Sequence, residues 1–90
     1  MSAPVIKLPE RATIAASASF YNEITHELDV HGALELDATA VSNIDAAFLQ
    51  LIASAFITAD QKGLKLAWKA KSECLEQSAR LVGLTALFKL

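Results

Sequence analysis

The sequence has little of several residue types on which particular functions depend. It contains one cysteine, Cys74, so an internal disulfide cannot form. Its three glycines, Gly32, Gly63 and Gly83, all stand where turns are expected, and none belongs to a glycine-rich phosphate-binding loop. The eight basic residues are scattered and the formal net charge is −2, which argues against a nucleic-acid partner.

The chain also lacks the long apolar runs that direct a protein into a membrane. Its most apolar stretch, residues 46–59, is interrupted by polar side chains, although 53% of all residues are hydrophobic. Three charged residues fall where the apolar core of a signal peptide would lie: Lys7, Glu10 and Arg11. We therefore expect one globular domain, residues 1–90, that is cytoplasmic and has no membrane insertion.

Three short runs alternate between apolar and polar residues with a period of two, at residues 5–8, 34–37 and 64–69. This period predicts strands with one buried face. The other face of each run carries charge: Lys7, Glu35, Asp37, Lys65 and Lys69. Strands buried on both faces would be almost continuously apolar. We therefore predict helices on one face of the sheet, and acid–base pairs across strands on the other.

Helical periodicity fills the intervals, at residues 15–28, 46–61 and 73–82. Expected ends are the N-caps Asp45 and Ser72 and the left-handed glycines Gly63 and Gly83. Residues expected to face inward from the last helix are Leu75, Ala79 and Val82. The loop 9–13 has room for extra extended structure, and residues 85–90 are expected to form a half-turn or an edge strand. The alternating order predicts an α/β fold with a small mixed, mostly parallel sheet of about three to five strands and helices packed on one face.

The helix expected at residues 46–61 has an unusual outer face. Its inward stripe is apolar: Phe48, Leu51, Ile52, Ala55, Phe56 and Ala59. Opposite lie uncharged residues: Ala46, Ala47, Gln50, Ala53, Ser54, Ile57, Thr58 and Gln61. Only Asp60 brings charge, at the edge, whereas a solvated helix normally carries Lys and Glu. The outer face therefore predicts a docking patch, and the alternative is an ordinary scatter of small surface apolar residues.

The connection into this helix, residues 39–45, follows a predicted strand. In open α/β sheets, ligands and partners bind beyond the carboxyl ends of the strands. Free backbone N–H groups at the helix start also suit an anion or a carboxylate. The predicted partner-binding residues are Ser42, Asn43, Asp45, Ala46, Ala47, Gln50, Ala53, Ser54 and Ile57.

Residues that would support catalysis or metal binding are few. His26 and His31 straddle the end of the first predicted helix and lack the i, i+4 spacing of helical zinc motifs, so we expect a solvated surface and no metal site. Ser17 and Ser19 have neither a glycine elbow nor a fixed base. Cys74 is expected to be a small buried or half-buried hydrophobe. We predict no enzymatic activity, no catalytic residue and no cofactor.

The order of these segments resembles the STAS (anti-sigma factor antagonist-like) domain family. Residues 34–47 resemble its central signature, a strand rich in Leu and Asp, a loop ending in Asp (here Asp45), and a long apolar helix. The run Lys62-Gly63-Leu64-Lys65-Leu66 resembles its glycine-initiated strand. The ending Leu81-Val82-Gly83-Leu84, with Leu87-Phe88, resembles the close of its last helix. The resemblance covers residues 34–88, while the N-terminal third has one clear strand where the family commonly has two.

The resemblance implies a regulatory module in signalling or transport. Family members bind anti-sigma factors, regulatory kinases, chemotaxis-type partners or transporter ATPases. Many are switched by phosphorylation of the Ser or Thr directly after the loop Asp. Ala46 occupies that position here, followed by Ala47 and by Phe48 in place of the family glycine, which implies a degenerate member without the phosphoacceptor. The alternatives are a small-ligand (lipid or nucleotide) carrier and a transporter-associated accessory subunit, and a homodimer through the same face remains open.

Overall fold

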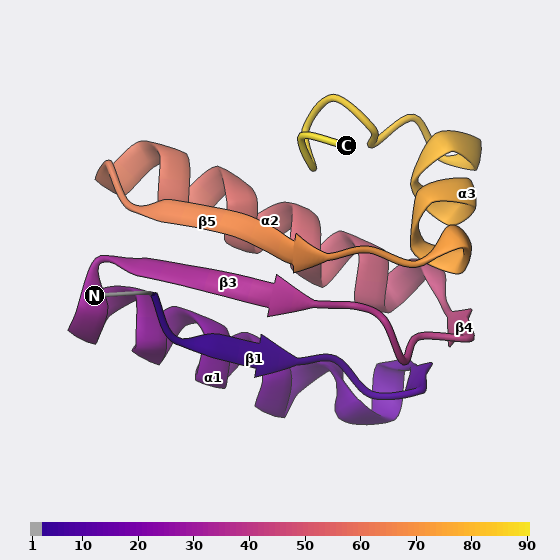
Figure 1. The fold of residues 1–90 in the computed structure, drawn as a ribbon, viewed down its shortest axis with the longest axis horizontal. Coiled ribbons are helices and arrows are strands. Elements are labelled where there is room, and N and C mark those ends of the chain that lie inside the picture. The colour runs from indigo at the N-terminus through magenta and orange to yellow at the C-terminus, as the bar shows by residue number, and fades with distance from the viewer. Residues whose placement is uncertain (1–2) are drawn as a thin grey trace.

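The computed structural model describes residues 3–90. Within them the chain forms three helices and five strands, arranged as in Figure 1. Their order is β1 (Val5–Lys7), β2 (Arg11–Ala12), α1 (Ile14–His31), β3 (Ala33–Asp37), β4 (Asn43–Ile44), α2 (Ala46–Lys62), β5 (Lys65–Ala70) and α3 (Glu73–Leu81). The three strands and three helices expected from periodicity are all present.

The described strands pair in parallel and form two sheets. The larger has the order β1-β3-β5, and the smaller consists of β2 and β4. This confirms the predicted small, mostly parallel α/β architecture, and β2 is the extra extended structure for which the loop 9–13 had room. The separate β2–β4 sheet was not predicted, because strands of two residues show no periodicity. It brings the segment before α1 beside the segment before α2.

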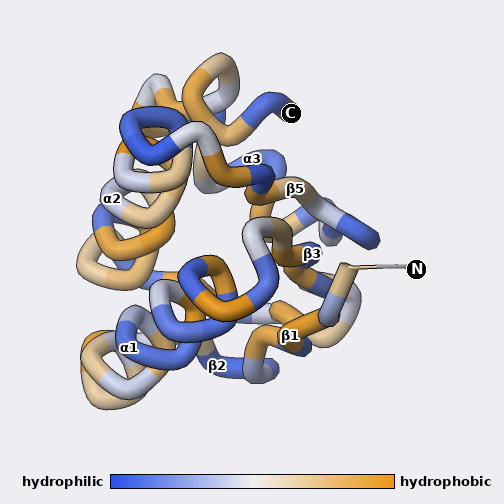
Figure 2. The backbone as a smooth tube through the Cα atoms, turned by 90° about the vertical axis from the view of Figure 1, so that its left-hand side faces the viewer, coloured by the Kyte–Doolittle hydropathy of each residue, from blue (hydrophilic) through white to orange (hydrophobic). Residues whose placement is uncertain are grey.

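Helices α1 and α2 cover one face of the three-stranded sheet, as Figure 2 shows. Ile6, Leu34, Leu36 and Leu66 point toward the helices and are buried, whereas the alternate strand residues are more exposed. The prediction that helices cover one face is therefore confirmed.

The acid–base pairs predicted across strands lie in neighbouring positions but do not form direct ion pairs. Lys7 stands in register with Asp37 on β3. Among residues 3–90, however, the ion pairs within 4.0 Å lie outside the strands: His31–Glu27, Lys62–Asp29 and Lys89–Asp60. The strand charges are solvated, so they have little to gain from direct contact.

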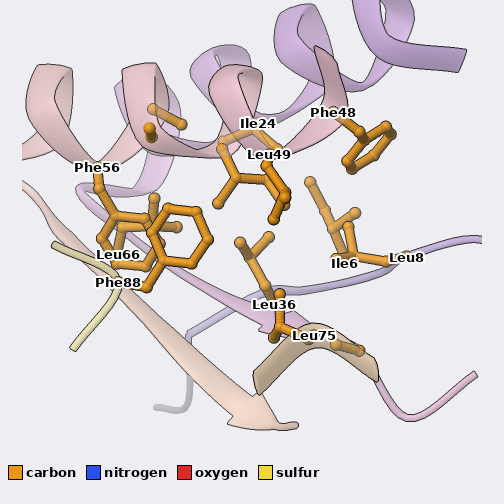
Figure 3. Packing of buried hydrophobic residues seen from close by; sticks show 14 of the residues in the cluster. Ile6, Leu8, Ile24, Leu36, Phe48, Leu49, Phe56, Leu66, Leu75 and Phe88 are labelled. Carbon is orange, nitrogen blue, oxygen red and sulfur yellow. The ribbon is translucent and has the colours of Figure 1, made fainter. Parts of the chain in front are cut away.

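One hydrophobic cluster joins all three helices to the larger sheet (Figure 3). At one end Phe88 is fully buried, and its ring stacks on Phe56 with centroids 5.7 Å apart. The Trp68 indole N–H donates to the Phe88 carbonyl at 2.9 Å. The segment after α3, expected as a half-turn or edge strand, therefore closes the core through turns and one aromatic anchor.

The ends of the helices follow the expected capping chemistry, with two differences. Gly63 and Gly83 are left-handed, and the Leu84 N–H donates to the Ala79 carbonyl at 2.8 Å, which completes a Schellman ending. Helix α1 runs on to His31, beyond residue 28 where periodicity predicted its end. Val82 was expected to face inward but is 51% exposed, and it is the C-cap residue that follows the last helical residue, Leu81.

Candidate docking surface

The outer face of α2 is exposed and carries no charge along most of its length. Ala46, Gln50, Ser54 and Ile57 are exposed, and the side chain of Ile57 is 45% exposed despite its size. Ala47 is half-buried at the edge of this face. The predicted inward stripe is buried except for Leu51, which is half-buried. The helix therefore has the orientation that its pattern indicated.

One residue predicted for the docking patch lies in the buried core. Ala53 is only 5% exposed. On the helix it lies on the same side as Leu49 and Asp60, and Asp60 pairs with Lys89 of the C-terminal segment at 3.7 Å. The C-terminal segment therefore lies along this side of α2, which the pattern of α2 alone could not reveal.

On the opposite side of α2 an open groove of about 420 Å³ separates it from α1. Helix α1 contributes three lining residues and α2 contributes four: Ala18, Tyr21, Asn22, Ala47, Gln50, Leu51 and Ser54. None of these lining residues is charged. The α1 residues were missed in the sequence, although the position of Tyr21 beside the inward stripe of its helix was a signal for them. The groove widens the uncharged outer face of α2 into a surface shared by two helices.

Asp45 joins the starts of these two helices. Its Oδ1 accepts the Phe48 N–H of α2 at 2.9 Å, and its Oδ2 accepts the Ile14 N–H of α1 at 2.8 Å. Its own N–H donates to the Ala12 carbonyl at 3.0 Å. Thr13 holds the N-cap position of α1 but makes no side-chain cap bond. The anion predicted for the start of α2 is thus supplied by the chain's own carboxylate, at the positive ends of two helix dipoles.

Backbone hydrogen bonds to the residue before β2 hold Ser42 and Asn43 and leave their side chains accessible. The backbone N–H groups of Ser42 and Asn43 both donate to the Glu10 carbonyl, at 2.9 and 3.2 Å, and both residues are exposed.

Thr39 donates from its hydroxyl and from its N–H to the Asp37 carboxylate. These two bonds, the hydroxyl bond foremost, lower the pKa of Asp37 below its ordinary value of 3.8, and nearby lysines act in the same direction.

The remaining polar residues make local contacts. The His31 Nε2 lies 3.2 Å from the Glu27 carboxylate on the same helix, and His26 is exposed. Cys74 is half-buried on α3. Over residues 3–90, no three His, Cys, Asp or Glu residues are grouped so that they could hold a metal ion. In that same range, none of the helices combines the length and the apolar character needed to span a bilayer.

The fold is that of a small parallel α/β domain of the STAS type. The family model described as "Mlab, STAS domain" matches residues 1–89, so the chain belongs to the STAS domain family. This is a family of regulatory and interaction modules that are generally non-catalytic. A comparison with curated proteins gives no match, so the assignment rests on the family model and the fold.

Proposed function

We propose that the chain is a non-catalytic regulatory module that docks to a partner protein through residues 39–45 and the outer face of α2. The observation that carries the proposal is the uncharged surface of α2, with Ile57 45% exposed at its centre. The surface continues into the uncharged groove beside α1. A contiguous exposed face without charge, bordered by polar residues, is typical of a protein-interaction site.

In this proposal docking is not switched by phosphorylation at the start of α2. Ala46 directly follows Asp45 there, and its methyl group cannot accept a phosphate. A phosphate at that place would add about two negative charges to the centre of the docking surface. The surface therefore stays neutral, and binding is either constitutive or controlled by the partner's own switch. By resemblance the partner class is an anti-sigma factor or kinase, a chemotaxis-type protein or a transporter ATPase, acting in the cytoplasm.

The filled core favours the docking function over storage of a small ligand. An apolar gap between sheet and helices would be needed to enclose a lipid or nucleotide. That space is occupied by buried side chains of the core (Figure 3). The groove beside α1 lies on the outside and is open to solvent. Native mass spectrometry of freshly purified protein separates the two functions, because a carrier retains its small molecule and a docking module shows the mass of the bare chain.

To test docking, a partner is first captured with the parent chain and purified, and its affinity for three variants is then measured. Ile57→Glu and Ala46→Glu place a charge on the exposed face without touching the core. Each should weaken the measured affinity by about tenfold or more, because the new charge would be buried unpaired in the interface. Ala67→Glu is the matched control, since Ala67 is exposed on the opposite, helix-free face of the sheet.

Unchanged thermal unfolding of all three variants shows that the fold is intact. The proposal fails if Ile57→Glu and Ala46→Glu bind as tightly as the parent chain. It also fails if Ala67→Glu loses affinity to the same extent, because the interface would then lie on the sheet.

A further inference from the structure

We infer that Asp45 is a positioning residue, whose carboxylate ties α1 to α2 and so sets the geometry of the groove between them. The two carboxylate oxygens accept N–H groups from different helices, 2.8 Å from the Ile14 nitrogen and 2.9 Å from the Phe48 nitrogen. A single rigid group therefore spans the starts of both helices. Two separate caps would stabilise each helix equally well but would not fix the distance between them.

The other contacts between α1 and α2 show why this tie matters. The Phe20 and Phe48 rings meet with centroids 5.7 Å apart, and Ile24 and Leu28 of α1 lie in the same buried cluster as the inward face of α2. Near the far ends, Lys62 and Asp29 form an ion pair at 3.3 Å, but both side chains are more than half exposed. Exposed pairs of this kind restrain little. Hydrophobic packing is non-directional. The directional restraint between the two helices therefore lies at their starts, where the β2–β4 pairing and the Asp45 carboxylate hold them.

The groove begins directly beside the tie. Ala47 lines it two residues after Asp45, and Ala18 lines it one helical turn after Ile14. A small rotation of α1 at its start changes the distance between these walls. A groove held at one width binds with a smaller ordering cost than one that must first be arranged. This functional consequence rests on the proposed docking function, whereas the geometric inference does not.

The experiment separates tying from capping. In the double variant Thr13→Asp/Asp45→Ser, the new carboxylate at position 13 caps α1 from a place that already has N-cap geometry, and the new hydroxyl at position 45 caps only α2. Each helix keeps a side-chain cap and the backbone pairing of β2 with β4 is untouched, so only the side-chain tie is lost. Tyr21 is the sole tyrosine and lines the groove, so incorporated 3-fluorotyrosine gives one fluorine NMR signal from this place. Thr13→Asp alone, with Asp45 kept, is the matched control.

We expect one sharp fluorine signal in the parent and in Thr13→Asp, and a shifted, exchange-broadened or doubled signal in the double variant. Melting temperatures of the three proteins should agree within a few degrees, because each helix keeps a side-chain cap and the Ile14 N–H, on an exposed residue, is free to bind water. An unchanged signal in the folded double variant overturns the inference. If the double variant does not fold, Asp45→Asn is judged by the same criterion, because its amide has one acceptor oxygen for two N–H groups.

A partner binding experiment then completes the test. If the tie positions the groove, the double variant should bind a purified partner several-fold more weakly, although its stability is unchanged. If the fluorine signal of the double variant is disturbed but the parent chain binds no partner, the inference about the tie is supported and the proposed docking function is overturned. If the fluorine signals are unchanged but the parent chain binds a partner, the docking function is supported and the inference about the tie is overturned. The two failures are therefore distinguishable.

Discussion

At the scale of single residues, Ile52 and Ile57 have the same side chain and different surroundings. Ile52 is fully buried in the core, whereas Ile57 is 45% exposed on the outer face of α2. We expect Ile52→Ala to lower the free energy of unfolding by about 2–5 kcal/mol, because it removes buried methyl groups and leaves a cavity. Ile57→Ala should cost about 1 kcal/mol or less. Urea unfolding measures both, and equal losses would show that α2 is turned the wrong way.

Asp37 provides a pH-dependent prediction at the same scale. The Thr39 hydroxyl holds the pKa of Asp37 below 3.8, so the charged carboxylate favours the folded state. Its contribution is present above the ordinary pKa and is lost as the pH falls through the lowered one. Thr39→Val removes the hydroxyl donor, and the pKa of Asp37 measured by NMR titration should rise toward 3.8. Thr58→Val, on α2, is the control and should leave the pKa of Asp37 unchanged.

At the scale of elements, periodicity predicted the helices and the longer strands and missed the short strand pair β2–β4, which depends on contacts between distant segments. The strands β1, β3 and β5 and the helices appear within a few residues of their expected bounds, because each has one buried face. The pair β2–β4 has two residues on each strand and no pattern, so only its position between two helix starts explains it. Helix α1 likewise extends to His31, beyond the predicted end at residue 28. Propensity at a helix end was outweighed by continued backbone hydrogen bonding up to Gly32.

The C-terminal segment is an element without regular structure that we nevertheless expect to be essential. Phe88 is fully buried against Phe56 and Trp68. Phe88→Ala should lower the free energy of unfolding by about 3–5 kcal/mol. It should also shift the fluorescence of Trp68, the sole tryptophan, to longer wavelength as water reaches the indole. Lys89→Gln removes only the exposed pair with Asp60 and should change neither quantity appreciably, and a similar loss in both variants would contradict the anchoring role of the aromatic ring.

At the scale of the whole molecule, the layering was predictable and the shared surface was not. Alternating charge on three strands indicated one bare sheet face, and the structure has it. The outer face of α2 could be identified from one helix alone, apart from Ala53. The groove and the double contact of Asp45 required the placement of α1 beside α2, which involves residues 31 positions apart in the chain. Tertiary proximity of this kind leaves no periodic trace in a single sequence.

The last prediction concerns cooperativity of the whole chain. A single buried cluster connects the described helices with the larger sheet, including Phe88 after the last helix. A domain with one continuous core should unfold in one step. Urea transitions followed by Trp68 fluorescence, which reports on the sheet and the C-terminal segment, and by far-ultraviolet circular dichroism, which reports on the helices, should therefore coincide. If fluorescence changed at lower urea than dichroism, the C-terminal segment would detach before the helices unfold. The side of α2 that Ala53 shares would then become accessible, and the proposed docking surface would extend around that helix.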